Sequence, residues 1–157
     1  MIMRYFMEKN ELTDLDDFLI YQIYGSARLL RFQLQKLLDE NEPNFTPEQA
    51  FLLYKLYMND GQSQRQLADK ILNDYPNITR LIDKLEKKGY VRREVDENDR
   101  RMFKVYMSEE GRSRFNSFIP LIMHQRGKLL KNISSEEEKI VKDVLKRIEQ
   151  NIQNYFL

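Results

Sequence analysis

Apolar residues recur at three- and four-residue steps along most of the chain, a spacing typical of amphipathic helices. The first such stretch runs from Leu15 to Leu38, and its apolar stripe is wider than one buried face requires. The last helix, which follows Ser134, carries a similarly broad stripe. We therefore expect both terminal helices to bury a second surface, beyond the one that faces their own core.

Helix boundaries between these two ends are marked by caps and glycines. Capping boxes at residues 46–49, 63–66 and 134–137 predict three helix starts. The helix that begins at residue 46 is expected to end at Asp60 and Gly61. A further helix, about residues 75–88, opens at a proline and closes at a glycine.

After that glycine the apolar period changes from helix to strand. Tyr90 to Val95 forms one predicted strand, and Met102 to Met107 alternates in a second one, with a polar connection between them. Ser108 is placed to cap the next helix. The sequence thus predicts a mainly α protein with a small β-hairpin (α+β). Short helices followed by a hairpin are the order of a winged helix-turn-helix, which places its second helix in the DNA major groove.

The composition is that of one folded domain, residues 1–157. Of these residues 41% are hydrophobic and 32% are charged, and the chain has no Cys and one His. Thiol catalysis, a thiol redox switch and Cys-based zinc binding are therefore excluded, and we expect no catalytic residue, metal ligand or cofactor. No apolar run approaches the roughly 18 residues of a membrane span, and no leader is visible. We expect a soluble cytoplasmic protein without a membrane partner.

Charge is unevenly distributed along the chain. Residues 63–108 carry 11 basic and 8 acidic side chains (net +3), whereas residues 1–62 carry 6 and 10 (net −4). Arg100 and Arg101 at the hairpin tip have the size and charge to enter the minor groove, where negative potential is concentrated. Other polar residues of this segment suit base edges and phosphates, and Lys84, Lys87 and Lys88 are expected on the far face of the 75–88 helix. The candidate DNA-binding residues from this reasoning are Ser63, Arg65, Gln66, Asn77, Thr79, Arg80, Lys84, Arg100 and Arg101.

Four segments of this region resemble the MarR family of bacterial transcriptional regulators. They are residues 66–68 (QLA), 76–91 (PNITRLIDKLEKKGYV), 96–101 (DENDRR) and 108–111 (SEEG). The flanking helices fall where the family has them, so the resemblance covers nearly the whole chain.

The resemblance implies a homodimer that binds a palindromic operator in double-stranded DNA. Residues 10–41 and 109–157 would be dimerisation helices, and residues 46–108 the DNA-binding lobe, with a wing at residues 96–101. It also implies that Asp99 orients the guanidinium of Arg101, which adds Asp99 to the candidate DNA-binding residues. We expect a sequence-specific regulator that acts as a repressor. Either a small organic effector releases it from the operator, or it has no effector.

Other interpretations of the same residues stay open. Arg80 is also explained as a solvent-facing helix residue or as a salt-bridge partner of Asp83 or Glu86. Asp99 and Arg101 are also explained as ordinary turn residues, because Asp and Asn favour hairpin connections. Core and dimer packing explains the aromatic residues of the first two helices at least as well as an effector pocket does. The alternative function is a winged helix that contacts protein or RNA without specific operator binding. An enzyme is disfavoured, because no nucleophile has an identifiable base.

Overall fold

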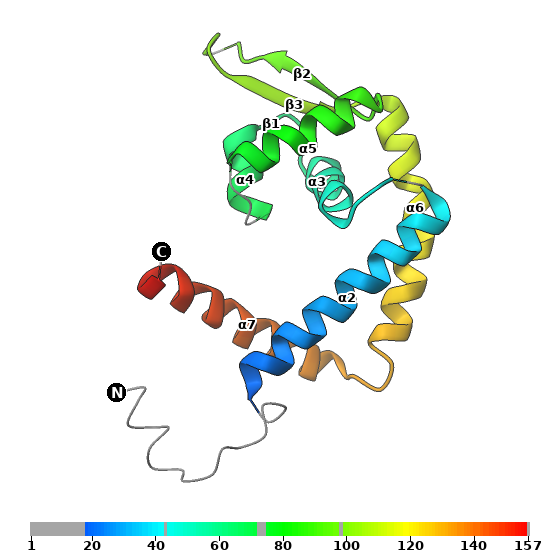
Figure 1. The fold of residues 1–157 in the computed structure, drawn as a ribbon, viewed down its shortest axis with the longest axis vertical. Coiled ribbons are helices and arrows are strands. Elements are labelled where there is room, and N and C mark those ends of the chain that lie inside the picture. Colours follow the sequence, from blue (N-terminus) through cyan, green and yellow to red (C-terminus); the bar gives the residue numbers. More distant parts are fainter. Residues whose placement is uncertain (1–17, 43, 72–74, 98, 157) are drawn as a thin grey trace. The chain divides into compact units, whose positions relative to one another are not determined.

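The computed structural model describes residues 18–42, 44–71, 75–97 and 99–156 (Figure 1). The chain forms two compact units, Met1–Arg112 and Ser113–Leu157. The prediction of a mainly helical protein with a small sheet is confirmed, while the predicted first-helix start at Leu15 lies outside the described residues. The elements are α2 (Leu19–Asn41), α3 (Pro47–Met58), β1 (Gln62–Ser63), α4 (Gln64–Ile71), α5 (Tyr75–Lys87), β2 (Val91–Val95), β3 (Phe103–Met107), α6 (Glu109–Leu129) and α7 (Ser135–Phe156).

All three predicted capping boxes form, at residues 46–49, 63–66 and 134–137. At the start of α3, the backbone N–H of Thr46 donates to Oε1 of Gln49 at 3.0 Å. The hydroxyl of Thr46 in turn accepts the backbone N–H of Gln49. Each box satisfies two backbone donors that a helix start otherwise leaves without partners.

The sheet has three antiparallel strands in the order β1-β3-β2, so it exceeds the predicted hairpin by the two-residue strand β1. β1 forms because α3 ends at Met58, two residues before the expected Asp60, and the chain then turns back towards β3. The side chain of Gln62 is buried, and its Nε2 donates to the carbonyls of Lys55 (3.0 Å) and Asn59 (2.6 Å). A buried amide is thereby satisfied, and β1 is tied to the end of α3.

The core of the first unit lies between the sheet and helices α3, α4 and α5. Most of its side chains come from the apolar stripes of the helices and from the inward face of β3, and Phe45 comes from the connection before α3. The fully buried apolar residues that contribute most volume are Phe45, Leu52, Leu53, Leu56, Leu67, Ile78, Ile82, Leu85 and Val105.

The base of the hairpin is fixed to the first turn of α6. Ser108 donates its backbone N–H to the carbonyl of Tyr90 and its hydroxyl to the carbonyl of Gly89, at 3.0 and 2.5 Å. The hydroxyl also accepts the backbone N–H of Gly111 at 2.9 Å, which confirms Ser108 as the helix cap. A Cβ on Gly111 would lie 2.0 Å from the carbonyl oxygen of Tyr90, so only glycine fits this close approach.

In the second unit, α7 begins at the capping box of Ser134 and Glu137. Arg126 of α6 donates to both carboxylate oxygens of Glu138 at 3.0 Å. Hydrogen bonds from Lys142 and Arg126 hold the pKa of Glu138 below its usual range. This exposed cluster fixes the α6–α7 connection but adds little stability, because water screens it.

Large apolar side chains stay exposed along both terminal helices. None of the residues Ser135–Phe156 of α7, all of which the structure describes, is buried, and α2 buries only Leu37 and Leu38. A helix with so little burial is not stable by itself in water, since most helical stability in proteins comes from packing one face. The exposed apolar residues include Leu19, Ile20, Tyr21, Tyr24, Leu29, Leu30 and Phe32 on α2, and Ile140, Val141, Leu145, Ile152, Tyr155 and Phe156 on α7.

Candidate nucleic-acid interface

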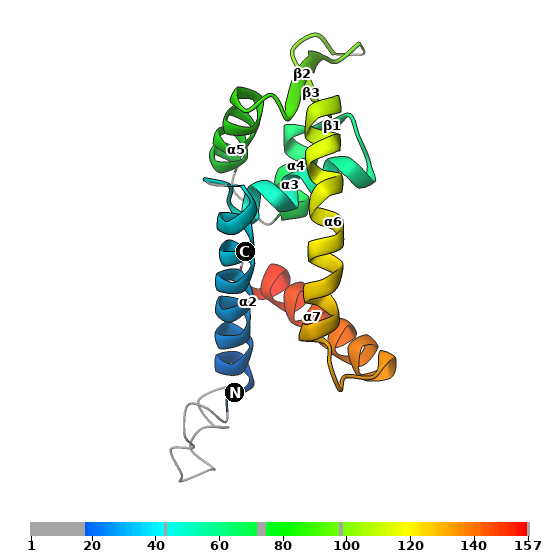
Figure 2. The same ribbon diagram turned by 90° about the vertical axis from the view of Figure 1, so that its right-hand side faces the viewer.

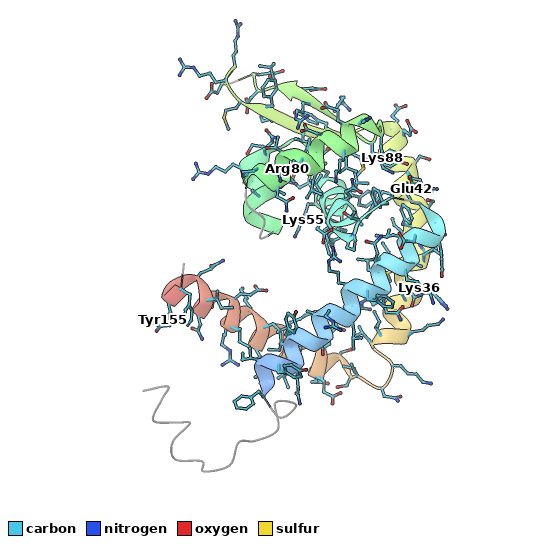
Figure 3. The ribbon with its side chains drawn as sticks, in the orientation of Figure 1. Lys36, Glu42, Lys55, Arg80, Lys88 and Tyr155 are labelled. Carbon is cyan, nitrogen blue, oxygen red and sulfur yellow. The ribbon has the colours of Figure 1, made fainter. Side chains whose placement is uncertain are left out.

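Helix α5 buries one face and presents a basic face on the other side. Its apolar residues Ile78, Leu81, Ile82 and Leu85 are buried, as the predicted helical spacing requires. About 180° around the helix lie the exposed side chains of the basic face, Arg80, Lys84 and Lys87. Figure 3 labels Arg80 on this helix.

The two acidic residues of α5 are held by Arg93 of β2. Nη2 of Arg93 lies 2.5 Å from Oδ1 of Asp83, and Nη1 bonds Oε2 of Glu86. The backbone N–H of Arg93 also donates to Oε1 of Glu86 at 3.1 Å. The side chain of Arg93 is only 19% exposed, and its charge is compensated by these two carboxylates.

This arrangement argues against one alternative for Arg80, a salt bridge within α5, and leaves the other, an ordinary solvent-facing residue, open. Asp83 and Glu86 pair with Arg93, and no ion pair joins Arg80 to either acid in the described part of the chain. The basic face of α5 thus lacks charge compensation from its own helix. Sequence reasoning missed Arg93, because its role depends on a contact between β2 and α5 that no local pattern indicates.

Lys88 does not belong to the basic face, and its expected place beside Lys84 and Lys87 is wrong. Its Nζ lies 3.3 Å from Oε1 of Glu42 and 5.6 Å from the ring centroid of Phe45. Helical spacing did not predict this contact, because it depends on Glu42 at the end of α2, which packs beside Lys88.

Asn77 and Thr79 are half-buried near the start of α5, and both interact within the protein. The carbonyl of Thr79 accepts a hydrogen bond from Nη2 of Arg93 at 3.5 Å. At the start of α4, the side chains of Ser63 and Gln66 form the capping box, while Arg65 is exposed. Capping therefore accounts for the side chains of Ser63 and Gln66, and Arg65 has no such role.

The wing, formed by β2, β3 and the connecting residues 96–102, carries its basic residues at the tip. Its strands pair from Val91 opposite Met107 to Val95 opposite Phe103. Arg100 and Arg101 are exposed. In two perpendicular views the tip extends beyond α4 and α5 (Figure 1 and Figure 2).

The turn of the wing is held by its own backbone and by Asp99. Oδ1 of Asp99 accepts the backbone N–H of Arg101 at 3.0 Å, and its carbonyl accepts the N–H of Met102 at 2.9 Å. The backbone N–H of Asp96 donates to the carbonyl of Met102 and closes the turn. The carboxylate of Asp96 pairs with Nζ of Lys104 at 3.3 Å. Asp99 thus shapes the backbone on which the Arg101 side chain stands. Pairing of its carboxylate with the guanidinium of Arg101 stays a prediction.

The described residues offer neither a metal site nor a membrane-spanning helix. Within the described residues there is no group of three or more His, Asp or Glu residues arranged to hold a metal ion, and His124 is exposed on α6. Among the helices that the structure describes, none is long and apolar enough to span a bilayer.

The short helices α4 and α5 with the three-stranded sheet and wing define a winged helix-turn-helix protein. The sequence model of the MarR family matches residues 45–103, from just before α3 to the start of β3. The chain is 29% identical over 136 residues to YdgJ, an uncharacterized HTH-type transcriptional regulator of Bacillus subtilis (strain 168), covering 87% of this chain and 80% of that protein. Both matches support a MarR-type DNA-binding transcriptional regulator rather than an enzyme.

Solved structures show the same fold. A MarR/EmrR family transcriptional regulator from Acinetobacter sp. ADP1 matches with a TM-score of 0.81 and 17% identity, over 90% of this chain and 99% of that chain. The S. aureus MepR protein, solved as a complex with DNA, matches with a TM-score of 0.75 and 22% identity, over 84% and 96%.

Proposed function

We propose that two copies of the chain bind a palindromic operator, each with α5 in a major groove and its wing in an adjacent minor groove. The observation that carries this proposal is the basic face of α5, whose neighbouring acids are neutralised by Arg93. Uncompensated cations on the exposed face of a helix attract the phosphates on both sides of a major groove. The structure of MepR with DNA, in the same fold, supports a role of this lobe in DNA binding.

The candidate residues divide by the part of DNA they suit. Arg80, near the start of α5, has the reach and donor geometry for a base edge. The ammonium of Lys84 and the planar guanidinium of Arg65 are suited to phosphates. Arg100 and Arg101, exposed at the wing tip, are placed for the minor groove, where Arg is attracted by the concentrated negative potential. Asp99 contributes by fixing the turn beneath Arg101.

The dimer is proposed from the exposed apolar stripes of α2 and α7. Both helices show more apolar surface than a monomer in water keeps uncovered, and both lie outside the winged lobe. Covering each stripe with the same stripe of a second copy gives the two-fold symmetry that a palindromic operator mirrors.

Regulation is proposed to be repression in the cytoplasm, through occupation of an operator that overlaps a promoter. A small organic effector would release the protein only to the extent that it binds a DNA-incompetent dimer more tightly, typically by about 1 to 3 kcal/mol. Transcription in vitro from a promoter that contains the operator tests the sign: repression lowers the yield of transcript, and activation would raise it.

Competition binding tests the proposal as a whole. The operator is first selected from randomised duplex DNA with the purified protein, and then competed against scrambled duplex and RNA at one salt concentration. Specific binding should exceed non-specific binding by at least about a thousandfold. Nearly equal affinities would instead favour the alternative, a winged helix that contacts protein or RNA.

A further inference from the structure

Four residues from distant parts of the chain meet where α2 ends, and we call them the Glu42 cluster: Glu42, Phe45, Lys88 and Tyr90. Oε1 of Glu42 accepts the hydroxyl of Tyr90 at 3.0 Å and lies 3.3 Å from Nζ of Lys88. The rings of Phe45 and Tyr90 meet edge to face, with centroids 6.2 Å apart, and Nζ of Lys88 lies over the ring of Phe45. Figure 3 labels Glu42 and Lys88 side by side.

The Glu42 cluster is shielded from water. Phe45 is 1% exposed and Tyr90 8%, and the side chains of Glu42 and Lys88 are 15% and 27% exposed. A charge pair in such surroundings is screened less than a surface pair, and removing one partner leaves the other poorly compensated. The cluster is therefore a firmer connection than the surface ion pairs of this chain.

The cluster joins α2 to the part of the lobe that is proposed to bind DNA. Glu42 follows the last residue of α2 and caps it through its backbone N–H. Lys88 and Tyr90 lie between α5, which ends at Lys87, and β2, which begins at Val91. One carboxylate thus holds the end of α2 against the link between the recognition helix and the wing.

Two further polar connections of α2 among the described residues do not reach the link between α5 and β2. Arg31 pairs with Glu48 of α3 at 2.9 Å, but Arg31 is 60% exposed. Gln35 donates to the backbone carbonyl of Phe45 at 3.0 Å, ahead of α3. Of these polar connections, the Glu42 cluster alone reaches the link between α5 and β2.

We propose that Glu42, Lys88 and Tyr90 are positioning residues that fix the angle between α2 and the recognition helix α5. This inference rests on the proposed dimeric binding of a palindrome. If α2 belongs to the dimer interface, its angle to α5 sets the distance and rotation between the two recognition helices. The cluster would then determine which spacing of half-sites the dimer accepts.

The spacing of half-sites supplies a test that a merely structural role would not pass. Moving the half-sites by one base pair shifts them by about 3.4 Å and rotates them by roughly 34° relative to each other. A dimer in which the angle between α2 and α5 is fixed loses affinity on such an operator. A dimer in which this angle can vary adapts to the shifted half-sites. The measured quantity is the spacing penalty, the ratio of Kd on the shifted operator to Kd on the selected operator.

The variants are Glu42→Gln, Tyr90→Phe and Lys88→Met, each in the full-length chain. We expect wild type to show a spacing penalty of at least about tenfold, because a shifted half-site loses optimal contacts with one of the two lobes. Each variant should bind the selected operator about three- to tenfold more weakly, and its spacing penalty should fall by at least about threefold. Tyr90→Phe removes one oxygen atom only, so the test does not depend on a variant that fails to fold. The double variant Glu42→Gln, Lys88→Met should bind the selected operator no more weakly than the more affected single variant. The reason is that both substitutions break the same ion pair.

Two matched lysine variants separate positioning from direct contact with DNA. Lys84→Met, on the basic face, should weaken binding and reduce the slope of log affinity against log salt by about one unit, while the spacing penalty stays. Lys36→Met, an exposed lysine of α2, should change neither quantity. Lys88→Met should keep the wild-type salt slope although its affinity falls.

Each contrary result has a defined meaning. A lower salt slope for Lys88→Met, matching Lys84→Met, would make Lys88 a phosphate contact and overturn the inference. Unchanged spacing penalties in all three variants would overturn it as well, with the proposed function intact. A wild-type protein indifferent to spacing would remove the proposed dimeric function and this inference together.

Discussion

Arg93 of β2 lies 2.5 Å from Asp83 of α5, and this contact binds the wing to the recognition helix. The same guanidinium bonds Glu86, one turn further along α5. Two carboxylates beside the basic face are thereby neutralised, and the strand and the helix that are proposed to approach DNA are held together.

Replacing Arg93 with Met should weaken operator binding about tenfold or more. The variant exposes two uncompensated carboxylates beside the basic face, and these repel phosphates. Fluorescence anisotropy with labelled operator measures the effect. Adding Asp83→Asn and Glu86→Gln to Arg93→Met should restore most of the affinity, and if it does not, charge compensation is not the role of Arg93.

Arg101→Ala should weaken operator binding while the dimer stays folded. Loss of one cation in the minor groove also makes the salt dependence shallower by up to about one unit of slope. Binding titrations at several salt concentrations measure both quantities. Unchanged affinity and slope would show that the wing tip does not contact DNA.

Gly111→Ala should destabilise the protein by about 2 kcal/mol or more, because the added Cβ meets the carbonyl of Tyr90 at 2.0 Å. Urea unfolding measures the change. Gly127→Ala is the matched control in the same helix. A Cβ there meets nothing within 4 Å, so that variant should be neutral or more stable by about 0.5 to 1 kcal/mol. Equal stability of the two variants would contradict the close packing of α6 on the wing base.

Truncation after Ile133 removes α7 and should abolish dimerisation and operator binding together. The reason is the exposed apolar stripe of α7, a helix in which no residue is fully buried within the chain. Sedimentation of the truncated protein tests this. An intact dimer would mean that α7 has another partner.

The stability of the α2–α3 connection should depend on pH through Glu48. Burial raises the pKa of Glu48, but hydrogen bonds from its own backbone N–H, from Thr46 and from Arg31, together with the charge of Arg31, outweigh burial, so the pKa is lowered. A lowered pKa in the folded state contributes stability above the ordinary value of 4.5, and this contribution is lost as the pH falls through the folded-state pKa. Glu48→Gln should therefore be less stable than wild type near pH 7, and the difference should shrink below about pH 4. Urea unfolding at both pH values measures it, and a difference that does not vary with pH would contradict the assignment.

Much of the fold was predictable because its signals are local. The capping box of Thr46 and Gln49, the cap at Ser108 and the buried stripe that includes Ile78 each follow from residues within one or two helical turns. β1 was not predictable, since two residues have no period, and its existence depends on pairing with β3 more than 40 residues away.

The candidate site shows the same division. The exposure of Arg80 and of Arg101 was predictable from helical spacing and from the hairpin turn. The partner of Lys88 was not, because Glu42 precedes it by 46 residues and only the packed fold brings the two together. Arg93 was missed for the same reason: its role arises from a contact between a strand and a helix.

Hydroxyl-radical footprinting of the full-length protein on its selected operator tests the central claim most directly. Two basic faces and two wings predict two protected segments related by two-fold symmetry, with centres about one helical turn or roughly 34 Å apart. Protection of the flanking minor grooves should be lost selectively in Arg101→Ala. A single protected segment, or protection that does not depend on the DNA sequence, would contradict the account.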